Sequence, residues 1–261
     1  MTIIANHTKQ RLAAGELALG IGVRQARTVD IAPIAKTCDY DWLFIDLEHG
    51  SLSLDTAAQI SVAALGAGIT PLVRVPGKEH HHATRLLDCG AQGIVWPHVD
   101  SAAEAKRLAD FCRYPPLGHR SVAGGSPQLG FRSLPVAEMT RQGNSEVLVV
   151  MMVETPQAIT EAEAMAALPG VDGILIGTND LCAEMGIPGQ FTDPRVEAAY
   201  KTVIDACRKH GKFPGMGGVY EPALMQKFIG MGMRFILSGS DLSFMMAAAS
   251  ARSAVLRSTK R

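Results

Sequence analysis

The stretch DWLFIDLEHGSLSLDTAAQISVAALGAGITPLVRV, residues 41–75, contains a complete strand–helix–strand unit. It opens with the apolar run of residues 41–49 and closes with a second apolar run at 70–75. Between them, residues 55–68 are rich in alanine and carry apolar positions at helical spacing, with Gly68 where a helix stop belongs. Two strands that are joined through a helix pair in parallel. The stretch therefore predicts a parallel sheet covered by helices.

The same alternation recurs along the whole chain. Eight apolar runs are candidate strands, at 17–23, 41–49, 70–75, 93–99, 147–154, 173–178, 213–218 and 234–241. Six segments between them have helical spacing, at 55–68, 81–91, 102–114, 155–168, 193–211 and 221–232. Eight strands alternating with helices in 261 residues predict an α/β protein with one (β/α)8 TIM barrel over residues 1–261. A doubly wound open sheet is the alternative, but no strand is followed by a glycine-rich phosphate loop.

Composition limits the possible partners and compartments. Apolar residues make up 47% of the chain, and 25 basic residues balance 25 acidic ones, which argues against nucleic acid or an anionic membrane as partner. No apolar run is long enough to span a membrane, and the N-terminus lacks the apolar segment of a signal peptide. The cysteine number is odd and no C-x-x-C pair occurs, so we expect buried reduced thiols and a cytoplasmic protein; the five are Cys38, Cys89, Cys112, Cys182 and Cys207.

Polar residues gather where the predicted strands end. The active site of a (β/α)8 barrel lies at the carboxyl ends of its strands. The strand bodies are almost free of ionisable groups, whereas the strand ends supply Asp46, Glu48, His49, Arg74, Trp96, His98, Glu154, Thr178, Asn179, Asp180, Ser238, Ser240 and Asp241. Burying so many charges without partners would be costly. We therefore expect a functional site at this end.

Each of these groups also has a structural interpretation. Asp180 could cap the following helix, and Arg74 could simply pair with a neighbouring carboxylate. His49 and His98 could be ordinary packed or solvated histidines. Glu154 is different, because Thr155 can cap the helix that starts at Pro156 and leaves the Glu154 carboxylate unexplained.

The residue types at the strand ends suggest metal chemistry. Two carboxylates from neighbouring strand ends, Glu154 and Asp180, suit Mg²⁺ or Mn²⁺ with positions left open for water and substrate. Arg74 could neutralise a developing oxyanion, and His49 could move a proton near neutral pH. The three consecutive histidines at 80–82 are expected to start a helix instead, since helical neighbours point about 100° apart and cannot face one metal.

Several stretches together resemble the HpcH/HpaI family of metal-dependent (class II) 2-oxo-acid aldolases. They are DWLFIDLEHG, PLVRV, LLDCGAQGIVWPHV, RYPPLGHRS, VMMVETPQAI, VDGILIGTNDLCAEMG and HGKFPG, and they are spread through the chain in the family's order. The resemblance implies an aldehyde-lyase that reversibly cleaves 4-hydroxy-2-oxo acids to pyruvate, or a pyruvate-like oxo acid, and an aldehyde through a metal-stabilised enolate. It also implies a (β/α)8 barrel whose last helix, about 242–257, packs on a neighbouring subunit of a hexamer.

The resemblance assigns roles residue by residue. Glu154 and Asp180 match the metal ligands, with Mg²⁺ or Mn²⁺ as the expected cofactor and Co²⁺ as a further candidate. Arg74 matches the arginine that stabilises the enolate, and His49 the acid/base histidine with Asp88 as its carboxylate partner. The oxo acid would bind at Gly177, Thr178, Asn179 and Asp180, and Asp46 and Glu48 would lie close to the acid/base pair. Trp96 and His98 are expected near the substrate.

Some positions depart from the family pattern. Met152 stands where the family often has glutamine, GTND replaces the commoner G-P-A-D, and Trp96 and His98 replace aliphatic residues. The loop 120–133, which contains Gln128, does not align well, so an arginine expected from a neighbouring subunit is not placed. Two alternatives follow: an acyl-CoA lyase of the citrate-lyase type, and a non-catalytic barrel that binds an oxo acid. No lysine stands at a strand end, which argues against a Schiff-base mechanism.

Overall fold

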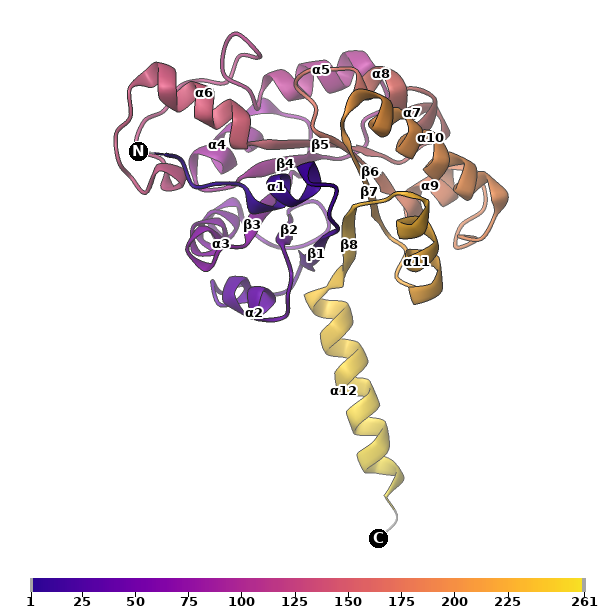
Figure 1. Ribbon diagram of the computed structural model, residues 1–261. Helices are drawn as coiled ribbons and strands as arrows, with labels where there is room; N and C mark the ends of the chain where they lie inside the picture. Colours follow the sequence, from indigo (N-terminus) through magenta and orange to yellow (C-terminus); the bar gives the residue numbers. More distant parts are fainter. Residues whose placement is uncertain (1, 260–261) are drawn as a thin grey trace.

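The computed structural model describes residues 2–259 and shows a closed barrel of eight parallel strands (Figure 1). The strands follow one another around the barrel in chain order: β1 Ala18–Val23, β2 Trp42–Asp46, β3 Thr70–Arg74, β4 Gly93–Trp96, β5 Leu148–Val153, β6 Gly173–Gly177, β7 Phe213–Gly217 and β8 Phe235–Ser240. The final strand pairs with the first, so no edge is left. The predicted (β/α)8 barrel is confirmed, and the open doubly wound sheet is excluded.

The strand bodies are almost entirely apolar because both of their faces are buried. One face fills the barrel with the cluster Leu12, Ala18, Trp42, Phe44, Leu72, Val95, Leu148, Val150, Met152, Leu175, Phe235 and Leu237. The other face packs against the surrounding helices in a larger cluster. Inside the barrel, the Trp42 ring stacks on Phe235 at 4.1 Å and lies over Gly20, where an added Cβ would come within 2.1 Å of it. Only glycine fits at position 20.

The helices surround the barrel and largely match the expected segments. Their bounds are α1 His7–Ala13, α2 Ile31–Thr37, α3 Leu54–Ala67, α4 His80–Asp88, α5 Ala102–Asp110, α6 Val136–Glu146, α7 Pro156–Thr160, α8 Ala162–Ala166, α9 Thr178–Glu184, α10 Pro194–His210, α11 Pro222–Met231 and α12 Asp241–Ser258, with a 3₁₀ turn η1 at Pro127–Leu129. The segment expected as one helix at 155–168 is divided at Glu161. Helices α2 and α6 were not expected, since Pro33 and Gly143 weaken their helical pattern.

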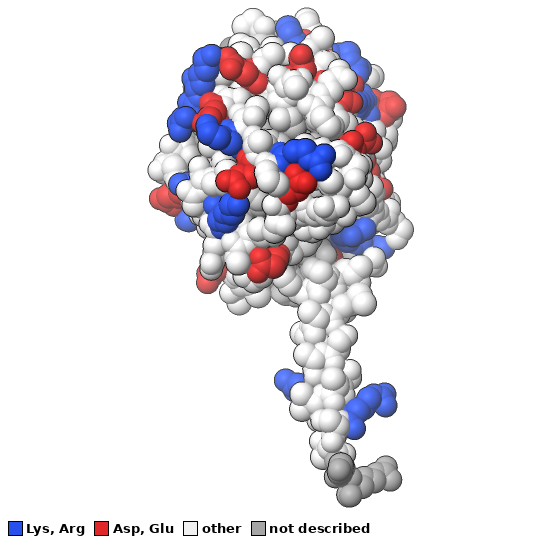
Figure 2. Space-filling model, turned by 90° about the vertical axis from the view of Figure 1, so that its right-hand side faces the viewer, with Lys and Arg blue, Asp and Glu red and all other residues white. Residues whose placement is uncertain are grey.

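The last helix, α12, leaves the barrel altogether (Figure 1). It begins with a capping box between Ser240 and Ser243, and none of its residues is buried. Figure 2 shows it as a mostly uncharged rod with basic side chains towards its free end, where Arg252 and Arg257 lie. Within residues 2–259 no helix is both long and apolar enough to cross a membrane.

The cysteines are free, but not all are buried. Cys112, Cys182 and Cys207 are buried, whereas Cys89 is half-buried and Cys38 is exposed. The expectation of reduced thiols fits the structure, and the expectation of burial is wrong for Cys38, which follows the last residue of α2 at the protein surface.

Candidate active site

A cavity of about 230 Å³ opens at the carboxyl ends of the strands. Seven of the eighteen residues that line it were predicted site residues: Asp46, His49, Arg74, Gly177, Thr178, Asn179 and Asp180. Other lining residues include Arg24 after β1, Met152 on β5, Gly217 and Gly218 at the end of β7, and Tyr220. The strand-end rule therefore located the cavity, because parallel strands deliver their last residues to one rim.

Arg74 is the centre of the charged network at the end of β3. It is only 6% exposed, and its Nε and Nη2 donate to the two carboxylate oxygens of Asp46 at 3.0 and 2.7 Å. Its remaining terminal nitrogen lies 2.9 Å from Glu48 Oε2 and 3.9 Å from the Met152 sulfur. Two carboxylates and the Phe44 ring, whose centroid is 5.0 Å from the guanidinium carbon, thus fix this cation beside the cavity.

Asp46 also shapes the turn that carries His49. Its Oδ1 accepts hydrogen bonds from the backbone N–H groups of Glu48 and His49, both at 3.1 Å. Burial opposes ionisation of Asp46, but the hydrogen bonds and charge of Arg74 outweigh it, and the pKa of Asp46 is lowered. An ionised Asp46 therefore holds both the arginine and the histidine-bearing turn, while the His49 side chain stays exposed and lines the cavity.

Glu154 is 1% exposed and follows the end of β5. One of its oxygens, Oε2, accepts from the backbone N–H of His98 at 2.8 Å and lies 3.1 Å from His98 Nδ1. The other, Oε1, is buried and has no hydrogen-bond partner within the described chain. Burial raises the pKa of the Glu154 carboxyl above its usual range, and the negative charge of Asp180 adds to the effect. A buried carboxylate oxygen without a donor is a place for a cation.

The surroundings of Glu154 fit a divalent metal. Position 177 has no side chain, and a Cβ there would come within 2.6 Å of the unpartnered Glu154 Oε1 and fill the space beside it. Asp180 lines the adjoining cavity in the first turn of α9. No cluster of three or more His, Cys, Asp or Glu side chains within residues 2–259 could hold a metal by itself. Two carboxylates with open positions match a cation that also binds water and substrate.

The turn at residues 177–180 presents backbone rather than side-chain groups. The Thr178 hydroxyl is buried, lies 2.7 Å from the Tyr200 hydroxyl and donates to the Gly217 carbonyl, so this side chain is structural. Gly218, with φ of +88°, leaves space beside the backbone nitrogens of Thr178 and Asn179, which a Cβ would approach to 3.3 and 3.1 Å. First-turn amides of a helix lack intrahelical acceptors and suit an anionic ligand.

His98 and Glu48 form a cluster next to the cavity. His98 has a left-handed backbone with φ of +51°, and its imidazole lies between Glu154 Oε2 and Glu48 Oε1, the latter 3.0 Å from Nε2. The Lys78 ammonium donates to the His98 carbonyl at 2.6 Å and holds the loop in place. His98 thus links the Arg74 network to Glu154.

Two expected site residues lie elsewhere. Trp96 is fully buried in the outer cluster near Phe111, because Val95 is the residue of β4 that points into the barrel. Asp88 is the last residue of α4 and does not line the cavity, and its carboxylate is 2.6 Å from Arg120 Nη2. The expectation that Trp96 lies near the substrate is therefore wrong, whereas Asp88 does not line the cavity of its own chain and its pairing with His49 stays a prediction.

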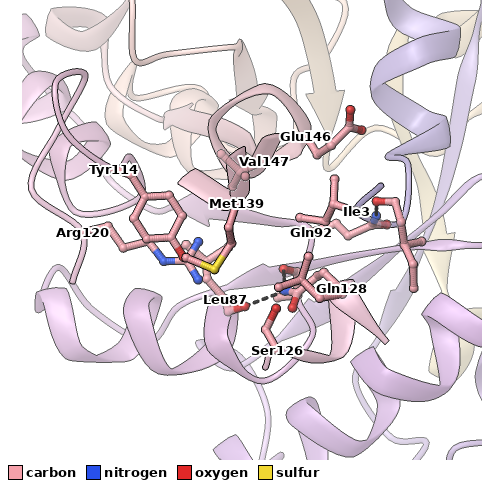
Figure 3. Close-up of a pocket in the computed structure, with 14 residues that line it drawn as sticks. Ile3, Leu87, Gln92, Tyr114, Arg120, Ser126, Gln128, Met139, Glu146 and Val147 are labelled. Carbon is pink, nitrogen blue, oxygen red and sulfur yellow. Dashed lines mark hydrogen bonds between the residues drawn. The ribbon is translucent and has the colours of Figure 1, made fainter. Parts of the chain in front are cut away.

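The poorly aligned loop 120–133 lies away from the cavity. Its Gln128 donates to the carbonyl oxygens of Leu87 and Ala91, and its Arg120 stacks over Tyr114 at 4.6 Å (Figure 3). These side chains surround a second, much smaller cavity of about 30 Å³, which also contacts the N-terminal segment. Gln128 therefore supports the outer wall of the barrel and does not line the strand-end cavity.

Arg24 is a lining residue that the sequence analysis missed. It is the first residue after β1, so the strand-end rule applied to residues 17–23 would have included it. Its Nε donates to the His49 carbonyl at 3.0 Å and lies 3.8 Å from Asp46 Oδ2.

The fold and this site define a (β/α)8 barrel with a carboxylate, arginine and histidine centre at the strand ends. The sequence profile of the HpcH/HpaI aldolase/citrate lyase family matches residues 24–248, and the chain belongs to this family. The 4-hydroxy-4-methyl-2-oxoglutarate aldolase of Hapsidospora irregularis is 39% identical over 92% of this chain and 91% of its own. The hydroxypyruvate/pyruvate aldolase of Sagittula stellata is 32% identical over 97% and 99%.

Solved structures agree with this assignment. An HpcH/HpaI aldolase from Desulfitobacterium hafniense has a TM-score of 0.91 and 27% sequence identity, with 97% of each chain covered. The chain is an aldolase-type carbon–carbon lyase, as the sequence analysis predicted. Citrate lyase β subunits also share the fold, but their identity of 15–16% carries no further conclusion.

Proposed function

We propose that this enzyme reversibly cleaves a 4-hydroxy-2-oxo acid to pyruvate, or a pyruvate-like oxo acid, and a carbonyl fragment with the help of a divalent metal. The observation that carries the proposal is the buried, unpartnered Glu154 Oε1 beside the side-chain-free position 177. Asp180 and the anchored cation of Arg74 lie at the same rim. The names of the aldolase relatives support the reaction class.

Each residue of the site has its own role in the proposed reaction. A cation bound by Glu154 and Asp180 supplies Lewis-acid polarisation of the 2-oxo group. The first-turn amides of α9, from Thr178 to Asp180, hold the substrate carboxylate, and Arg74 stabilises the oxygen that gains charge as the C3–C4 bond breaks. His49 removes the proton of the C4 hydroxyl as the bond breaks, and C3 of the resulting enolate takes up a proton to give pyruvate. Among residues 2–259 no lysine lines the cavity, which supports a metal route over a Schiff base.

The decisive experiment follows the methyl protons of pyruvate in deuterated water by NMR. With Mg²⁺ or Mn²⁺ the enzyme should exchange them, and chelator should stop the exchange. Glu154→Gln should lower the exchange rate about 100-fold or more, because it weakens a metal ligand. Glu184→Gln, an exposed position on α9, is the matched control and should exchange at the wild-type rate. Exchange that survives both chelator and Glu154→Gln would refute the metal site.

The nature of the metal and the compartment are part of the proposal. Hard carboxylate oxygens favour Mg²⁺ or Mn²⁺, with Co²⁺ as the further candidate. Five free cysteines suit a reducing compartment such as the cytoplasm.

A hexamer with exchanged helices is the proposed assembly. Helix α12 has no buried residue, and its apolar side chains need a partner surface. An apolar groove of about 620 Å³ on the barrel's outer wall is lined by Val62 and Phe131 and also by Asp88. Because Asp88 and His49 are apart in one chain, Asp88 can serve as the histidine's partner only from a neighbouring subunit.

A further inference from the structure

Arg24 stands out because its guanidinium is held through one nitrogen only, whereas that of Arg74 is paired through all three. Arg74 is paired with Asp46 and Glu48. On the proposed function, Glu154 and Asp180 are matched by the divalent cation. The Arg24 side chain donates one hydrogen bond, from Nε to the His49 carbonyl, and the same nitrogen lies near the Asp46 carboxylate. Among residues 2–259, neither of its terminal nitrogens has a hydrogen-bond partner.

The backbone around Arg24 is held in place, although its side chain is 43% exposed. Asp241, the first residue of α12, accepts hydrogen bonds from the backbone N–H groups of Arg24 at 3.0 Å, Gln25 at 2.9 Å and Ala26 at 2.7 Å. The guanidinium is therefore presented to the cavity from a fixed turn. A planar fork with two free donor nitrogens is suited to a carboxylate.

The position of Arg24 indicates which part of the substrate it meets. On the proposed function, the C1 carboxylate lies at the start of α9 and the C4 hydroxyl lies at His49. Arg24 contacts the backbone of His49, and both residues line one cavity. A carboxylate attached to C4 shares its carbon with the C4 hydroxyl. It therefore lies on the side of the cavity where His49 and Arg24 meet.

We propose that Arg24 is the specificity residue that binds a carboxylate on C4, so that the preferred substrates are 4-hydroxy-2-oxo diacids whose second cleavage product is itself a 2-oxo acid. This inference rests on the proposed function and adds the substrate class. A cavity of about 230 Å³ is small enough to favour a compact diacid over a long-chain aldehyde adduct.

The test compares two substrates that differ only at C4. The diacid is 4-hydroxy-4-methyl-2-oxoglutarate, and the matched monoacid is 4-hydroxy-4-methyl-2-oxopentanoate, in which a methyl group replaces the carboxylate. Release of pyruvate gives kcat/KM for each. The wild-type enzyme should favour the diacid, and Arg24→Gln should lower the diacid-to-monoacid ratio about 30-fold. Arg24→Lys keeps the charge without the fork and should lower the ratio by a smaller factor.

The control is Arg208→Gln, which removes an exposed arginine on α10 that pairs with Asp205 and does not line the cavity. The diacid-to-monoacid ratio of kcat/KM for this control variant should equal that of the wild type. If Arg24 only supported His49, Arg24→Gln would slow both substrates equally and the inference would be refuted. A wild-type enzyme that prefers the monoacid refutes it as well. Failure of wild-type pyruvate exchange would instead overturn the proposed function, so the two failures are distinguishable.

Discussion

At the scale of single residues, the Arg74 network shows how one ion pair can organise a site. Arg74 is buried, and each of its three nitrogens has a distinct contact with Asp46, Glu48 or Met152. Asp46 accepts two hydrogen bonds from Arg74 and also accepts one from the His49 backbone N–H, which fixes the turn that leads to His49. Removing Asp46 would leave the buried Arg74 with Glu48 as its one remaining carboxylate partner, and removing Arg74 would leave the buried Asp46 without its main partner, which costs more than the pair itself contributes.

Asp46→Asn should therefore destabilise the protein by about 3 kcal/mol at neutral pH. The folded-state pKa of Asp46 lies below its ordinary value of 3.8, so its stabilisation is fully present above that pH and is lost as pH falls through the folded pKa. The difference from wild type should be constant between pH 8 and about 5 and shrink below pH 3.8. Urea unfolding of both proteins at a series of pH values measures this difference in the free energy of unfolding.

The matched control for this prediction is Asp39→Asn. Asp39 is exposed and has a left-handed backbone, which asparagine also adopts easily, so its free energy of unfolding should change by less than about 0.5 kcal/mol. A destabilisation by Asp46→Asn that persists unchanged at pH 3 would show that its ionisation does not matter for the fold.

At the scale of elements, glycines show which strands and helices have room for a side chain. Gly20 on β1 lies against the Trp42 ring in the barrel interior, and an added Cβ would come within 2.1 Å of that ring. Gly66 on α3 has no atom within 4 Å of the corresponding Cβ position. The same substitution should therefore have opposite effects at the two positions.

Gly20→Ala should lower the free energy of unfolding by about 3 kcal/mol, since Trp42 is stacked on Phe235 and cannot move aside without cost. Gly66→Ala should raise it by about 0.5 to 1 kcal/mol, because alanine loses less backbone freedom in a helix. Thermal and urea unfolding of both variants test the pair. Equal effects would show that the interior contact at Gly20 relaxes freely.

At the scale of the whole molecule, α12 is the feature that a single subunit does not explain. Its exposed apolar side chains include Met245 at 59%, Met246 at 57%, Val255 at 64% and Leu256 at 66%. An apolar helix directed into water is unfavourable in a monomer and favourable when another subunit covers it.

Val255→Asp combined with Leu256→Asp should therefore break the assembly, because it places two charges on the surface that a neighbour would cover. Light scattering after size-exclusion chromatography should show a hexamer for wild type and a smaller species for the double variant. Arg252→Gln, which alters a charge on the same helix without adding one to its apolar residues, should keep the wild-type mass. A monomeric wild type would contradict the assembly.

The sequence by itself determined the barrel and the rim at which the site lies. Repeated apolar runs and helical segments are sufficient for a (β/α)8 fold, and chain direction places residues such as Arg74 and Asp180 at the same end. Helix α6 escaped this pattern because it buries only Met139, Gln142 and Gly143 and so carries no extended apolar face.

Only the tertiary structure decided which side chains face the cavity. Strands that are apolar on both faces carry no alternation, so the sequence could not show that Val95 points inward and Trp96 outward. The length of α4 carries Asp88 away from the strand ends, although its sequence resembles an active-site motif. The free terminal nitrogens of Arg24 likewise follow from where its neighbours lie in space, which no local pattern encodes.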